Sequence, residues 1–104
     1  SYAGGKGVQK SDVDAAKWFR RAADQGIPFA QLNLGLLYAA GNGVPQDNVE
    51  ALKWLELAFF GLPAGSTRSD VARAMTDVTS KMTREQIDEA KRRESSWKVH
   101  LEVK

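Results

Sequence analysis

The sequence YAAGNGVPQDNVEALKW, residues 38–54, decides the fold, because a near copy, YAGGKGVQKSDVDAAKW, occupies residues 2–18. When the chain is aligned with itself at an offset of 36 residues, ten of the 24 positions from residue 2 to residue 25 are identical. A fixed period of about 20 to 50 residues is typical of stacked repeats. The identical pairs are Tyr2 and Tyr38, Ala3 and Ala39, Gly5 and Gly41, Gly7 and Gly43, Val8 and Val44, Val13 and Val49, Ala15 and Ala51, Lys17 and Lys53, Trp18 and Trp54, and Ala22 and Ala58.

Each period is expected to contain two helices, because apolar residues recur at spacings of three, four and seven. Asp47 and Thr83 are suitable N-terminal caps, and glycine and proline residues mark the turns between helices. No segment alternates apolar and polar residues, so we predict no sheet. The predicted helices span residues 12–25, 28–40, 47–61, 68–81 and 83–100.

The 104 residues suffice for one small domain, in which we distinguish three parts. Residues 2–26 form a partial repeat and residues 27–62 a full one. Residues 63–104 lack the Gly-x-Gly-Val loop, so we interpret them as a divergent helix pair that caps the C-terminal end of the stack.

The small residues and the tryptophans of the repeat predict how the helices pack. Gly35 and the repeated alanines allow helix axes to approach to about 8–10 Å. Trp18 and Trp54 then fill the remaining space. We therefore expect both indoles to be buried between neighbouring hairpins, each burying on the order of 150–250 Å².

The repeated pattern resembles the Sel-one-like repeat, a bacterial and eukaryotic relative of the tetratricopeptide repeat. The resemblance implies an all-α, right-handed superhelix of antiparallel helix hairpins, with about five helices, that acts as a protein-interaction scaffold. It also implies that the chain is the C-terminal part of a longer repeat protein, and it favours the bacterial periplasm or cell envelope because bacterial relatives are often exported. The residues that carry it in the second copy are Ala30, Leu34, Gly35, Tyr38, Gly41, Gly43, Val44, Asp47, Ala51, Trp54 and Ala58, and in the first copy Tyr2, Gly5, Gly7, Val8, Ala15, Trp18, Ala22, Ala23 and Gly26.

Composition and motifs argue against catalysis and against cofactor or metal binding. The chain has no cysteine, and its one histidine, His100, is expected on the surface. The Gly41–Gly43 loop follows a helix rather than a strand, and Gln46 stands where a dinucleotide fingerprint has its third glycine. A formal net charge of +2 with intermixed signs gives no nucleic-acid footprint, and no apolar stretch is long enough for membrane insertion. We therefore predict a protein that is not an enzyme and has no cofactor.

A second apolar stripe on the helix over residues 28–40 is the candidate binding surface for a protein or peptide. Leu32 and Leu36 lie at its centre. In tetratricopeptide-type arrays the corresponding stripe lines the concave groove, but in a longer array it could instead pack against another repeat. The candidate partner-binding residues are Phe29, Gln31, Leu32, Asn33, Leu36 and Ala40.

Three further questions stay open at this stage. The chain could be a purely structural cap that ends the array and has no ligand of its own. The helix around Trp18 lacks a preceding neighbour in this sequence, so the chain could self-associate through that face. The charged run Lys91–Glu94, with Lys98 about one turn further on, is either a solvated face or a docking patch for an acidic partner.

Overall fold

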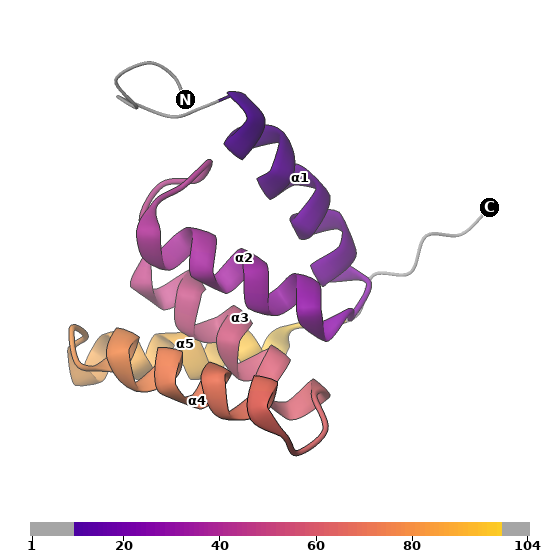
Figure 1. Ribbon diagram of the computed structural model, residues 1–104. Helices are drawn as coiled ribbons and strands as arrows, with labels where there is room; N and C mark the ends of the chain where they lie inside the picture. The colour runs from indigo at the N-terminus through magenta and orange to yellow at the C-terminus, as the bar shows by residue number, and fades with distance from the viewer. Residues whose placement is uncertain (1–9, 99–104) are drawn as a thin grey trace.

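A computed structural model describes residues 10–98 of the chain, and within that range it is entirely helical (Figure 1). The prediction of an all-α fold with about five helices is confirmed. The expectations that concern Tyr2–Val8 and His100 lie outside the described residues. The helices are α1 (Lys10–Asp24), α2 (Pro28–Ala40), α3 (Asn48–Gly61), α4 (Ser66–Thr79) and α5 (Arg84–Ser96).

The helices form stacked antiparallel hairpins. Helices α2 and α3 form a closely packed antiparallel pair, and α4 and α5 each pack against α3; α2 and α4 lie in the nearer layer of Figure 1, with α3 and α5 behind them. Helix α1 packs against α2 at the other end of the stack, and α3 contacts both helices of the last hairpin. The predicted helical repeat solenoid is thus the observed architecture.

The helix ends follow from local hydrogen bonding. The Asp47 carboxylate accepts the backbone N–H groups of Val49 and Glu50 at the start of α3. Thr83 and Gln86 form a reciprocal capping box at the start of α5. Helix α5 ends at Ser96, four residues before the predicted end, because Trp97 adopts an extended backbone with φ −68° and ψ 137°.

Small residues at the helix crossings allow the close packing that the sequence predicts. A Cβ atom built on Gly35 would lie 3.0 Å from Leu55 Cγ and 3.2 Å from the Ala51 carbonyl oxygen. Glycine at this position therefore lets α2 and α3 touch along their length. The core around this crossing consists of Ala51, Leu52, Leu55, Leu62, Val71, Val78 and Ala90.

The two repeated tryptophans lie in opposite environments. Trp54 is 1% exposed and packs against Ala30 and Leu34 of α2 and Ala23 of α1. Trp18 is 68% exposed, so the prediction that it is buried was wrong. The physical reason is that, among residues 10–98, no helix lies on Trp18 in the way that α2 lies on Trp54.

Candidate interaction surface

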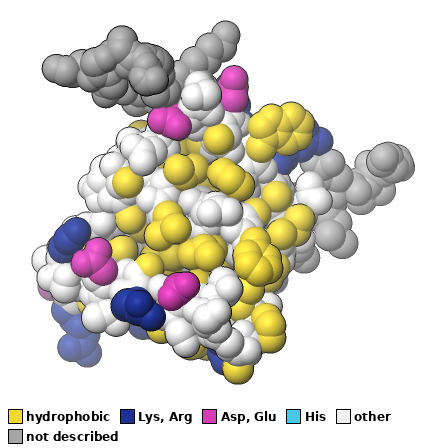
Figure 2. Space-filling view, viewed as in Figure 1, with side chains coloured by type: hydrophobic (Ala, Val, Ile, Leu, Met, Phe, Trp, Pro, Cys, Tyr) yellow, Lys and Arg dark blue, Asp and Glu magenta, His cyan; other side chains and the backbone are white. Residues whose placement is uncertain are grey.

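Helix α2 presents an apolar stripe to solvent and carries no charged side chain. Phe29 is 57% exposed and Leu36 is 43% exposed, while Leu32 is half-buried against the core and Ala40 is exposed. Figure 2 shows hydrophobic side chains gathered over this face of the molecule. A contiguous apolar surface flanked by polar residues is a common feature of protein-binding sites.

Five of the six sequence-predicted contact residues lie on or beside this stripe, and Gln31 is the exception. Asn33 is exposed at its margin. Gln31 is only 3% exposed, and its Nε2 donates a hydrogen bond to the Ala23 carbonyl oxygen over 3.1 Å. Its neighbours one turn ahead, Leu34 and Gly35, are both buried, which places Gln31 on the core side of α2. Gln31 therefore fastens α2 to α1 and is not available to a ligand.

A groove of about 440 Å³ adjoins the stripe between α2 and α4. Its α2 wall is apolar. Its opposite wall carries Val78 of α4 and a local i,i+4 ion pair, with Lys81 Nζ, just after α4, 3.9 Å from an Asp77 carboxylate oxygen. The lining residues are Leu36, Leu37, Ala39, Ala40, Asn42, Asn48, Asp77, Val78 and Lys81.

The α4 side of the groove was missed by sequence reasoning. Residues 64–104 do not repeat the earlier pattern, so no offset alignment assigns Asp77, Val78 or Lys81 to the α2 face. The one available signal was general: in a stack of hairpins, the first helices of successive hairpins line the same side.

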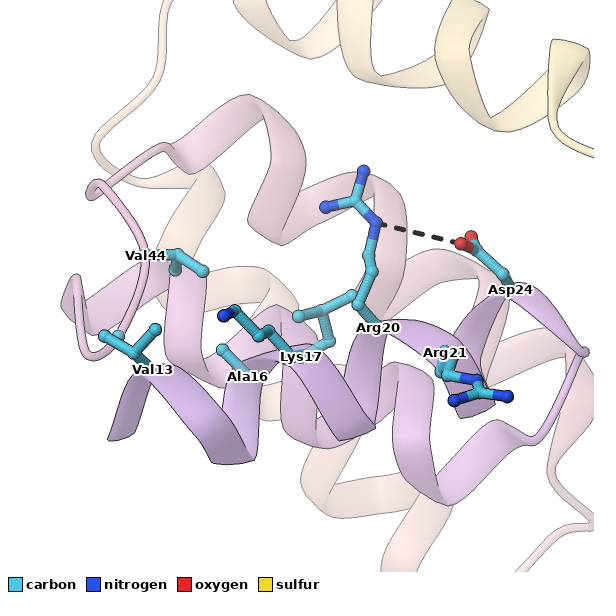
Figure 3. Close-up of a pocket in the computed structure, with 9 residues that line it drawn as sticks. Val13, Ala16, Lys17, Arg20, Arg21, Asp24 and Val44 are labelled. Atoms are coloured by element: carbon cyan, nitrogen blue, oxygen red, sulfur yellow. Dashed lines mark ion pairs between the residues drawn. The ribbon is translucent and has the colours of Figure 1, made fainter. Parts of the chain in front are cut away.

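A second hollow, of about 310 Å³, lies between α1, α2 and the loop at Val44 (Figure 3). Val13, Ala16 and Val44 give it an apolar floor. Lys17, Arg20, Arg21 and Asp24 also line it, so its charged groups are mainly cationic. Arg20 Nε lies 3.9 Å from an Asp24 carboxylate oxygen, and Arg20 Nη1 donates to the Tyr38 hydroxyl over 2.8 Å.

The basic run near the C-terminus has an internal role. Lys91 Nζ lies 2.7 Å from Glu56 Oε2, and Arg93 Nη1 lies 2.7 Å from Glu50 Oε2. Both pairs join α5 to α3. Lys91, Arg92 and Arg93 are all exposed, as expected of a solvated face, and Lys91 and Arg93 also attach α5 to α3.

The surroundings of the α3–α5 contact shift the pKa values of two glutamates, Glu94 and Glu50, in opposite directions. Burial and the hydrogen bond and charge of Glu56 raise the pKa of Glu94 to about 7. Burial also favours a higher pKa at Glu50, but Lys53 and Arg93 outweigh it, so the pKa of Glu50 is lowered overall. Both groups serve the α3–α5 contact and neither lines the α2–α4 groove.

The described residues do not assemble other recognisable chemistry. No group of three or more His, Cys, Asp or Glu side chains within residues 10–98 is placed to hold a metal ion. None of the five helices is both long and apolar enough to cross a bilayer. The groove beside α2 adjoins the uncharged apolar stripe, and it is the candidate interaction surface.

Comparison with known proteins identifies the repeat. The Sel1 repeat family model matches residues 1–27 and again residues 28–59, which together make up more than half of the chain. No curated protein matches the sequence, and no solved structure matches either.

Proposed function

The chain belongs to the Sel1 repeat family, and from this premise we propose that it is a non-catalytic module whose α2–α4 groove binds an apolar segment of a partner protein. Repeats of this family are helical modules that generally mediate protein interactions. The observation that carries the proposal is the exposed, uncharged stripe of α2 beside a groove of about 440 Å³.

The composition of the groove indicates what kind of segment fits. Leu36 and Ala40 supply apolar contacts for one or two aliphatic or aromatic side chains. The amides of Asn42 and Asn48 line the same groove and can hydrogen-bond to the backbone of an extended peptide. The charge on the α4 wall is balanced, because Asp77 and Lys81 lie within an ion pair. An extended, largely apolar peptide therefore suits this surface better than a highly charged one.

Selection from a random peptide library, followed by fluorescence anisotropy with the selected peptides, tests this proposal. We expect Leu36→Asp to weaken binding about 10- to 100-fold, because it removes apolar contact and places a charge in the groove. Trp18→Asp is the matched control, since it alters an equally accessible apolar side chain on α1. Equal losses from the two variants, with helicity retained, would refute the assignment to this groove.

A second candidate function, a structural cap, is favoured by the outer surface of the last helix. Arg84, Glu85, Asp88 and Arg92 of α5 are all exposed. Terminal repeats of solenoids need such a polar outer face to stay soluble. If no peptide is selected above the background of a scrambled control, the capping role is the one that remains.

A further inference from the structure

The hollow between α1 and the loop at Val44 combines an apolar floor with a cationic rim (Figure 3). Its lining residues on α1 include Val13, Lys17, Arg20 and Asp24, which are spaced at i, i+4, i+7 and i+11 and therefore share one face of the helix. The chemical character of this face changes in one direction. It is apolar near the loop, basic in the middle and acidic toward the end of α1.

The two central cations differ in how the protein holds them. Arg20 Nη1 donates to the Tyr38 hydroxyl over 2.8 Å, and the guanidinium carbon of Arg20 lies 5.9 Å from the centroid of the Trp54 ring. These contacts fix the guanidinium in place and leave most of its five N–H donors for a ligand. Lys17 makes no hydrogen bond or ion pair with any of residues 10–98. The hollow thus has one pre-positioned cation and one cation that lacks a partner among the described residues.

We propose that this hollow is a second binding site, separate from the α2–α4 groove, for an extended peptide segment that carries an aliphatic, an acidic and a basic side chain at alternate positions. From Val13 to Asp24, α1 rises about 16 Å, which is the length of about five extended residues. Alternate side chains of an extended peptide face the same side. The aliphatic side chain would contact Val13 and Val44, the carboxylate would pair with Lys17 and Arg20, and the basic group would face Asp24.

Charge complementarity selects this occupant. Three cationic side chains line the hollow against one carboxylate, so a wholly apolar segment would cover charges without pairing them. The guanidinium carbon of Arg21 lies 5.6 Å from the centroid of the Trp18 ring, so this residue adds positive potential beside the hollow. A wholly acidic segment would place a like charge against Asp24. A small organic anion would match the apolar and basic regions but would leave the acidic end of the face without a partner.

A titration of the isotope-labelled chain with the capped peptide LSESK, followed by amide chemical shifts in NMR, tests the proposal. We expect a Kd on the order of 100 μM to 1 mM, because one small apolar contact and exposed ion pairs are individually weak. The shifts should centre on Ala16 and Val44, which line the hollow, and not on Val78 of the α2–α4 groove. The matched peptide LSKSE has the same composition with the charges exchanged, and it should bind at least about tenfold more weakly.

Three results of this titration would overturn the proposal. The first is equal affinity for the two peptides, and the second is the absence of shifts around the hollow up to about 5 mM peptide, well above the expected Kd. The third is hexanoate binding as tightly as LSESK, which would assign the hollow to small organic anions.

Charge reversal on the protein tests the role of the unpaired cation. Lys17→Glu should weaken LSESK binding at least about tenfold, because it replaces an attractive charge with a repulsive one. Arg73→Glu is the matched control, since it makes the same change of charge on α4, where the Arg73 side chain is 78% exposed. Circular dichroism checks that both variants stay folded. Equal losses of affinity in the two folded variants would show that only the overall charge matters, and the assignment to the hollow would be wrong.

Discussion

The variants Trp54→Ala and Trp18→Ala change the same position in the two copies of the repeat. Comparing their stabilities shows how much of the loss is due to burial of the side chain. Both tryptophans occupy equivalent positions in the 36-residue repeat, yet Trp54 is 1% exposed and Trp18 is 68% exposed. We expect Trp54→Ala to destabilise the fold severely and Trp18→Ala to have little effect. The pair is informative because the chemical change is the same in both variants.

The magnitude follows from the area that each indole buries. A fully buried tryptophan removes about 150–250 Å² from water, worth roughly 4–6 kcal/mol at about 25 cal/mol per Å². Mutational data on buried aromatic residues give about 3–5 kcal/mol, and we adopt that range for Trp54. Trp54 Nε1 has no hydrogen-bond partner among the described residues, so the loss is one of packing, including the edge-to-face contact with Trp97 at 6.1 Å. Trp18 buries only about a third of its surface, which corresponds to about 1 kcal/mol once the higher helix propensity of alanine is counted.

Thermal denaturation followed by circular dichroism measures this difference directly. For a domain of this size, 1 kcal/mol changes the Tm by about 4–8 °C, so Trp54→Ala should lower the Tm by more than about 12 °C. Trp18→Ala should lower it by less than about 8 °C. The measurement is made at a few micromolar, because association at higher concentration would raise the Tm. Similar Tm values for the two variants would refute the packing that we assign to Trp54.

Two further predictions concern the α3–α5 contact and the loop before α3. Because the pKa of Glu94 is raised to about 7 from the ordinary value of 4.5, the free energy of unfolding should fall as the pH rises between those values. Urea denaturation should show that Glu94→Gln removes most of this dependence; the pKa of Glu50 is lowered, so its own contribution is lost only below this window. Gly43→Ala should destabilise the fold by roughly 1–3 kcal/mol in the same assay, since φ is +76° there and the new Cβ would clash with the Asp12 carbonyl oxygen. Unchanged stability of this variant would show that the α1 contact of the loop is not required.

The hairpin stack could be predicted because its signals are local or repeat along the chain. Gly35 sits where two helices touch, and the 36-residue offset marks equivalent positions without any knowledge of contacts. Caps such as Thr83 with Gln86 depend on residues only three apart, so their sequence pattern is sufficient. Helix type, number and order follow from these signals.

Burial depends on neighbouring helices, and the repeat pattern alone does not determine it. The identity of Trp18 and Trp54 predicts the same environment for both, but only Trp54 has α2 packed over it. The choice of Gln31 as a partner-binding residue is a different error, and the spacing of buried residues along the helix could have prevented it. Since its neighbours at i+3 and i+4 are Leu34 and Gly35, its position on the buried side was readable from the sequence.

The ion pairs that attach α5 to α3 were the feature that the sequence predicted least well. The run Lys91–Arg93 looks like a solvated or ligand-binding face because its partners, Glu50 and Glu56, lie about 40 positions earlier and share no motif with it. Glu56 is 4% exposed, so its charge requires a nearby cation, and Lys91 supplies one at 2.7 Å. The buried carboxylate on α3 therefore explains why α5 is basic at these positions, and it follows that a charge run outside the repeat pattern should be compared first with buried charges of the helix against which it packs.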